Sequence, residues 1–150
     1  MFSGQELKQD NQIIKNDGFW PDLNLADFQR ERSMSPNLNV ALLSQALVSA
    51  MIEINITLEN YQITQKAKGI NLAQEIGVIS FDGLSSTVII YNKAVFARAK
   101  ADLIGEFVSI SNREDKIGES QLQMAKSLIA ESSREVRKIL GLKRTSVVLI

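Results

Sequence analysis

The longest regular hydrophobic pattern of the chain lies between residues 36 and 68. Large apolar side chains recur there at steps of three and four residues, which is the spacing of one face of an α-helix. Ser35 suits the N-cap, Pro36 the first helical position, and Gly69 the position just after the last turn. We therefore predict one long helix from Pro36 to Lys68. Its core-facing stripe comprises Leu43, Leu47, Met51, Ile54, Leu58 and Tyr61.

A second apolar stripe follows the same predicted helix. Val48, Ile52 and Ile56 lie about 100° around the helix axis from the first stripe. A long helix that is apolar on two sides usually has packing neighbours on both. We interpret these three side chains as candidates for contact with another subunit. The charge-free run 33–52 nears the length of a membrane span, but its Asn, Gln and Ser side chains would be costly in lipid, so we expect no membrane contact.

Three further helices are predicted from apolar spacing and from capping residues. They are a short helix that follows Asn24 and ends at residues 30–32, a long helix from Ser85 or Ser86 to about Ile110, and another from Glu119 to Leu140 with Gly141 behind it. The segment 70–83 mixes Gly, Asn and Asp with short apolar residues. It predicts a connecting loop with one helical turn, ending at Asp82-Gly83.

The two ends of the chain differ from its middle. Residues 1–15 are polar and lack periodicity, which is typical of a flexible arm. Residues 144–150 are rich in Val, Leu and Ile and favour an extended strand. This tail either packs back on its own domain or joins a neighbouring sheet edge or groove. We expect a single all-α domain over residues 1–150, a small bundle of two to three long helices plus a short N-terminal helix, with a flexible arm (1–15), a helical body (16–141) and an extended, strand-like tail (142–150).

Turn-forming residues surround the one Trp of the chain in the segment Asn16-Asp17-Gly18-Phe19-Trp20-Pro21-Asp22. Such a composition predicts a turn with an aromatic anchor. Phe19 and Trp20 either fill the core of their own chain or anchor a neighbouring subunit, and the sequence leaves both alternatives open.

Composition removes most catalytic chemistry. The 150 residues include neither His nor Cys, so imidazole bases, thiolate nucleophiles, Cys/His metal sites and disulfides are excluded. Glu114-Asp115, beside Arg113, lies in the most polar predicted loop and is interpreted as a solvated surface. No phosphate-binding, calcium-binding or nucleophile motif is present. We expect neither an enzyme nor a cofactor nor a metal.

The distribution of charge indicates the function less strongly than the missing residue types do. Lys plus Arg and Asp plus Glu are equal at 17 each, which disfavours a dedicated DNA-binding protein. The C-terminal end is locally basic through Arg134, Arg137, Lys138, Lys143 and Arg144. These cations either complement a helix dipole or contact nucleic acid or an acidic partner.

Several segments, in order along the chain, resemble the head completion/stabilisation protein family of bacteriophages with contractile tails. The most specific is Asn16 to Asp22, which follows a short arm as it does in that family. The supporting segments are Ser35-Pro36, Asp82-Gly83, Tyr91-x-x-Ala94-Val95, Ala99-Lys100-Ala101-Asp102-Leu103 and Gly141-x-x-Arg144-Thr145-Ser146-Val147-Val148-Leu149-Ile150.

The resemblance implies a structural virion protein that is added at the portal vertex after DNA packaging, following assembly in the host cytoplasm. Its implied partners are the portal protein, a tail completion or terminator protein, and further copies of itself in a ring, a dodecamer in the particle. Packaged DNA would lie nearby without sequence-specific binding. The alternative is a small helical nucleic-acid-binding packaging or regulatory factor. The residues expected at protein interfaces are Phe19, Trp20, Val48, Ile52, Ile56, Arg144, Val147, Val148, Leu149 and Ile150.

Overall fold

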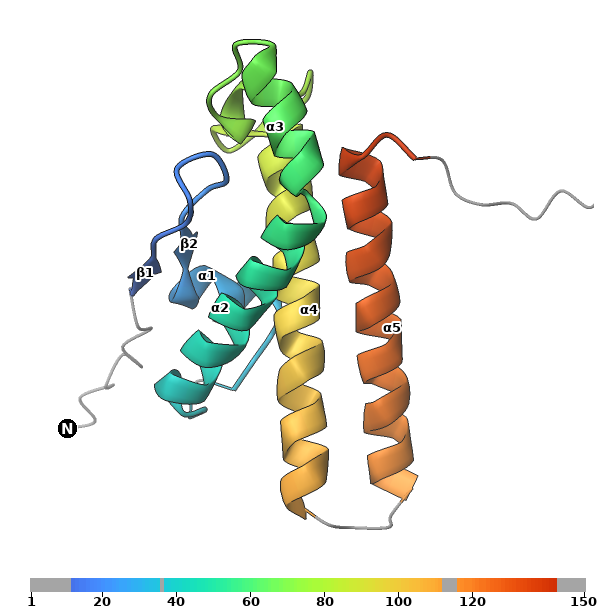
Figure 1. Cartoon of the computed structure of the whole chain (residues 1–150). Coiled ribbons are helices and arrows are strands. Elements are labelled where there is room, and N and C mark those ends of the chain that lie inside the picture. Colours follow the sequence, from blue (N-terminus) through green and yellow to red (C-terminus); the bar gives the residue numbers. More distant parts are fainter. Residues whose placement is uncertain (1–11, 36, 112–115, 143–150) are drawn as a thin grey trace, which may run out of the picture.

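The computed structural model describes residues 12–35, 37–111 and 116–142 (Figure 1). Their elements are β1 (Ile13–Ile14), β2 (Leu23–Asn24), α1 (Leu25–Glu31), α2 (Val40–Thr57), α3 (Glu59–Ala67), the 3-10 helix η1 (Ala73–Glu75), β3 (Ser80–Phe81), β4 (Leu84–Ser85), α4 (Ser86–Ser111) and α5 (Lys116–Ile139). β1 pairs with β2, and β3 pairs with β4, both antiparallel.

Helix α4 is the centre of the molecule. α5 runs antiparallel along one side of α4, and α2 packs on another side (Figure 1). Three buried alanines at three- and four-residue steps, Ala94, Ala97 and Ala101, give α4 a face of small side chains. The Ser132 hydroxyl of α5 donates a hydrogen bond to the Ala94 carbonyl at 2.8 Å. Small side chains at such a contact let two helices approach closely.

The expected bundle of two to three long helices plus a short one is wrong. The described residues form five α-helices and two small antiparallel sheets. One cause is that the helix predicted over 36–68 is divided into α2 and α3 at Leu58, whose φ and ψ are −95° and 7°. The Thr57 hydroxyl donates to the Glu53 carbonyl at 3.0 Å, a contact of the kind that bends helices.

The start of that helix is also corrected. The sequence predicts that Ser35-Pro36 begins it, but the N-cap is Asn39, whose side chain accepts a hydrogen bond from the Ala41 amide at 2.9 Å. An Asn side chain at this position satisfies an amide that the helix itself leaves unbonded. The periodicity itself is confirmed, because Leu43, Leu47, Met51, Ile54 and Leu58 of the first stripe are buried.

The second cause of the error is that both small sheets lie in segments predicted without strands. β1 begins inside the predicted arm, while residues 1–11 and 143–150 lie outside the described residues, so the division into arm, body and tail stays a prediction. β3 lies at the end of the predicted loop and β4 directly after it, and between them Asp82 and Gly83 have φ of 52° and 76°. Two successive positive φ values make the hairpin turn that Asp-Gly favours.

The remaining helix predictions agree with the structure to within a few residues. Asn24 caps α1, accepting from the Ala26 amide at 2.8 Å. The Ser85 hydroxyl accepts from the Val88 amide at the start of α4. At the end of α5, the Leu142 amide donates to the Arg137 carbonyl at 2.9 Å around Gly141, whose φ is 72°. This is the glycine-dependent helix ending that the sequence predicts.

A paired guanidinium and carboxylate tie α1 to α5. Arg32 donates to both carboxylate oxygens of Glu131, at 2.9 and 3.1 Å, and the two side chains are 15% and 20% exposed. The hydrogen bonds from Arg32 lower the pKa of Glu131.

We expect Glu131→Gln to lower the free energy of unfolding at neutral pH by about 1–2 kcal/mol, because the bidentate, charge-assisted hydrogen bonds from Arg32 are lost. The folded pKa of Glu131 is below its ordinary value of 4.5. Its contribution is therefore present above that value and is lost as pH falls through the folded pKa. Urea unfolding of both chains should show the difference shrinking as the pH falls below 4.5, the ordinary pKa of the side chain. A difference that is independent of pH would contradict this assignment.

Candidate protein interface

The segment Asn16–Asp22 closes on itself as a tight loop. One Asp17 carboxylate oxygen accepts hydrogen bonds from the amides of Phe19 and Trp20, both at 3.0 Å. The Asp22 carboxylate accepts from the Asn16 amide at 2.8 Å and from the Lys15 ammonium at 3.2 Å. The hydrogen bond from the Asn16 amide, supported by Lys15, lowers the pKa of Asp22. The turn expected from sequence is thus built by its two aspartates.

A ring of side-chain amides and a phenol fixes this loop to α2 and α4. Asn16 donates to the Tyr91 hydroxyl at 2.9 Å, Tyr91 donates to Asn55 at 2.6 Å, and Asn55 donates to Asn16 at 2.8 Å. Burial raises the pKa of Tyr91. Sequence reasoning did not predict this network, because its members are 36 to 75 residues apart.

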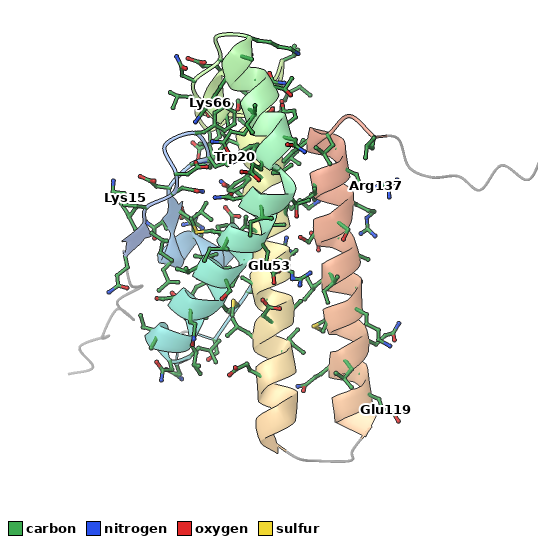
Figure 2. The ribbon with its side chains drawn as sticks, viewed as in Figure 1. Lys15, Trp20, Glu53, Lys66, Glu119 and Arg137 are labelled. Carbon is green, nitrogen blue, oxygen red and sulfur yellow. The ribbon has the colours of Figure 1, made fainter. Side chains whose placement is uncertain are left out.

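The loop delivers its two aromatic side chains into the core of the same chain. Phe19 and Trp20 are each 2% exposed. Trp20, labelled in Figure 2, is stacked on Tyr91, with ring centroids 4.6 Å apart. The centroid of the Tyr61 ring lies 6.1 Å from that of Trp20. Phe19 meets Trp20 edge to face at 5.0 Å. In the structure, Phe19 and Trp20 therefore fill the core of their own chain. Side chains so deeply buried present almost no surface to a partner subunit.

The second stripe of α2 is different, because it is exposed. Val48, Ile52 and Ile56 are 39%, 55% and 68% exposed, on the face of α2 turned away from the core. Among the described residues, α2 is also the one helix long and apolar enough to cross a membrane by length and composition, a test that core helices of soluble proteins also pass. The role of Val48, Ile52 and Ile56 at an interface stays a prediction, but the structure leaves these residues available for one.

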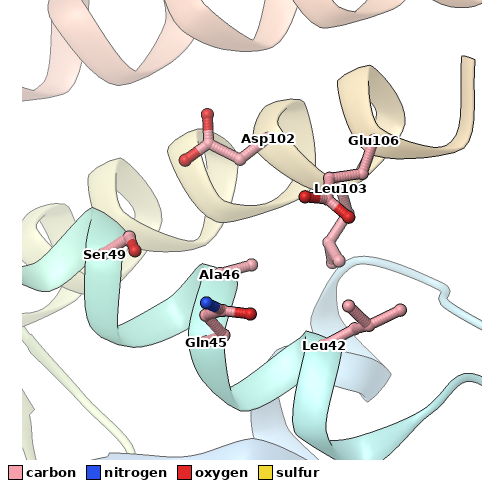
Figure 3. A pocket seen from close by; sticks show the side chains of 7 residues that line it. All are labelled: Leu42, Gln45, Ala46, Ser49, Asp102, Leu103 and Glu106. Carbon is pink, nitrogen blue, oxygen red and sulfur yellow. The ribbon is translucent and has the colours of Figure 1, made fainter. Parts of the chain in front are cut away.

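A groove of about 230 Å³ lies between the first half of α2 and the second half of α4 (Figure 3). Its lining residues are Leu42, Gln45, Ala46, Ser49, Asp102, Leu103 and Glu106. Burial raises the pKa of Asp102, and the nearby Glu53 carboxylate acts in the same direction, whereas Arg98 opposes them. The groove combines an apolar wall with carboxylates. In the part of the chain that the structure describes, no three acidic residues are grouped to hold a metal ion.

The basic end of α5 is partly engaged in contacts within the chain. The Glu135 carboxylate is buried and lies 2.8 Å from the Lys138 ammonium and 3.5 Å from that of Lys93. Arg134 is exposed. The other predicted contact residues, Arg144, Val147, Val148, Leu149 and Ile150, lie outside the described residues, as do Glu114 and Asp115.

An exposed apolar surface that the sequence did not predict surrounds the β3–β4 hairpin. Val78, Ile79 and Phe81 are 101%, 71% and 75% exposed, and Leu72 and Leu84 beside them are also exposed. We call these five residues the hairpin patch. The signal available in the sequence was the Asp82-Gly83 dipeptide between apolar residues, which is typical of a hairpin.

Known proteins resemble this chain over nearly its whole length. The family model described as phage head completion protein (GPL) matches residues 14–150. The "Probable head completion/stabilization protein" of Haemophilus phage HP1 (strain HP1c1) is 33% identical over 150 residues, which cover all of both chains. The "Head completion/stabilization protein" of Escherichia phage P2 is 30% identical over 113 residues, 74% of this chain and 67% of that protein. No solved structure matches. The chain therefore belongs to the phage head completion protein family, a family of virion-associated structural proteins rather than of enzymes.

Proposed function

We propose that this head completion protein docks on the portal vertex after DNA packaging, as a ring of copies that closes the DNA exit and offers a surface to the tail. The observation that carries the proposal is the exposed stripe Val48, Ile52 and Ile56 on α2. Three apolar side chains in a row on one helix face are an unfavourable surface for an isolated chain and a suitable one for a protein contact.

The proposed ring requires a contact between two different surfaces of neighbouring copies. When two different patches of a chain meet on neighbouring copies, the copies assemble head to tail and close into a ring if the rotation permits. Many weak contacts made at once then give a tight assembly on the portal. Packaged DNA would lie close to such a ring without being read in a sequence-specific way. The partners on the two sides would be the portal protein and a tail completion or terminator protein.

The last four residues offer the most direct test. We expect deletion of Val147–Ile150 to abolish ring formation and portal docking, because the tail loses its large apolar side chains. Electron microscopy of portal complexes would measure docking, and circular dichroism should show unchanged helix content. A chain with these residues replaced by Gly and Ser, at the same length, separates the effect of sequence from that of length.

Unaltered assembly by the truncated chain would refute tail docking. Salt-dependent DNA affinity of the purified chain, without a ring on portals, would instead favour a nucleic-acid-binding factor, because neutralised phosphates release counterions. Microscopy of intact particles with this chain localised decides between the vertex and any other position.

A further inference from the structure

The hairpin patch is the most exposed apolar surface of the described residues. Three of its side chains, Val78, Ile79 and Phe81, are 71% to 101% exposed. All three lie on β3 or in the two residues before it. The described elements of the chain therefore leave the β3 side of the hairpin uncovered, although it is the part with the largest apolar side chains.

The two edges of the hairpin also differ in their hydrogen bonds. On β4, the Gln74 side chain donates to the Gly83 carbonyl at 2.9 Å and accepts from the Ser85 amide at 3.0 Å. It thus satisfies that edge as a neighbouring strand would. On β3, the pairing of Ser80 with Ser85 and the bond from the Ser86 amide to the Ile79 carbonyl turn the backbone of Ser80 outward. No described residue bonds the amide or the carbonyl of Ser80, so the β3 edge can accept a further strand.

The C-terminal segment, residues 143–150, follows α5 at the end of the molecule where the hairpin lies. Ser132 of α5 bonds to Ala94 of α4, and the two helices are antiparallel. Gly141 lies nine residues after Ser132, and Ser85 of β4 lies nine residues before Ala94. Because the two helices are antiparallel, α5 ends level with the hairpin (Figure 1). The eight residues 143–150 can span at most about 26–29 Å when extended. Their sequence ends in Val-Val-Leu-Ile, which favours a strand with large apolar side chains.

We infer that the C-terminal segment of one copy adds as a third strand to the β3 edge of the neighbouring copy, with its apolar side chains covering the hairpin patch. The inference rests on the proposed ring and identifies the surface that receives the tail. Backbone hydrogen bonds to Ser80 provide the pairing, and alternate side chains of the added strand meet Ile79 and Phe81. Because the tail and the hairpin are different surfaces, their contact is head to tail, the arrangement that a ring requires.

A cysteine pair tests this contact, since the chain has no Cys of its own. Particles are assembled with a chain that carries Ser80→Cys and Val148→Cys, and are then oxidised and separated on non-reducing gels. We expect a ladder of covalently joined copies. The matched control combines Ser120→Cys with Val148→Cys. Ser120 is exposed but lies near the start of α5, at the opposite end of the bundle from the hairpin, so this chain should give no ladder.

Each outcome has a separate meaning. A ladder that needs Ser80→Cys supports the inference. An oxidised single chain of altered mobility, without a ladder, would show that the tail returns to its own hairpin and would overturn it. Particles that contain the chain but give no product with Ser80→Cys would overturn the inference and leave the vertex ring standing. Particles that lack the unsubstituted chain as well as the cysteine variants would refute the proposed function and the inference together.

Discussion

Replacing Trp20 with alanine should lower the free energy of unfolding by about 3–5 kcal/mol, the range for removing a large aromatic side chain from a core. Trp20 is 2% exposed and stacked on Tyr91, with Tyr61 on a nearly parallel plane. Its removal leaves a cavity between the N-terminal loop, α3 and α4 that the surrounding helices can only partly fill. Urea unfolding followed by circular dichroism would measure the loss.

Trp20→Phe is the matched control. The indole nitrogen of Trp20 is buried and has no hydrogen-bond partner among the described residues, so phenylalanine loses volume but no hydrogen bond that the structure describes. We expect less than half of the alanine effect, because the aromatic contacts with Tyr91 and Phe19 are retained in kind. If Trp20→Ala cost less than about 1 kcal/mol, the loop would not belong to the core, and the intersubunit alternative would be favoured.

The choice between core and interface for Trp20 could not be made from the sequence. It depends on Tyr61 and Tyr91, which lie on two other helices and reach the indole only in the folded chain. The sequence identifies Asn16–Asp22 as a turn because Asp17 and Asp22 act locally, within six residues. Local chemistry is visible in a sequence, whereas the partners of a buried ring are not.

The long apolar pattern shows the same limit within one helix. Periodicity correctly assigned the buried side chains from Leu43 to Leu58, because burial of one helix face imposes that spacing. It did not locate the break at Leu58, which changes the path of the backbone without changing which residues are apolar. The start at Asn39 was missed because Ser35-Pro36 is an equally good cap by composition. Capping rules name suitable residues, and packing selects among them.

Of the candidate interface, the sequence predicts the α2 stripe but not the hairpin patch. The stripe Val48, Ile52 and Ile56 was found as an excess of apolar residues over what one core face needs, and the structure leaves these residues exposed. The hairpin patch was not found, because its strands have two residues each and show no alternation. Very short strands carry too little pattern to be separated from a loop.

We expect Ile52→Glu to weaken assembly on the portal by at least about 100-fold while leaving the single chain folded. Ile52 is 55% exposed in the single chain, so the substitution should change the free energy of unfolding by no more than about 0.5 kcal/mol. In an interface between copies the added carboxylate would be buried without a partner, which is far more costly than its exposure to water. A 100-fold loss corresponds to about 2.8 kcal/mol. Titration of portal complexes with each variant, read by microscopy or native mass spectrometry, measures it.

Met124→Glu separates this effect from a general loss of apolar surface. Met124 is 50% exposed, close to the value for Ile52, but it lies on α5. If the α2 stripe is an interface between copies, only Ile52→Glu abolishes the ring, and urea unfolding of the two variants remains close to that of the parent chain. Equal assembly by both variants would mean that neighbouring copies do not meet through α2. The ring would then depend on the tail and the hairpin alone, which the cysteine pair detects independently.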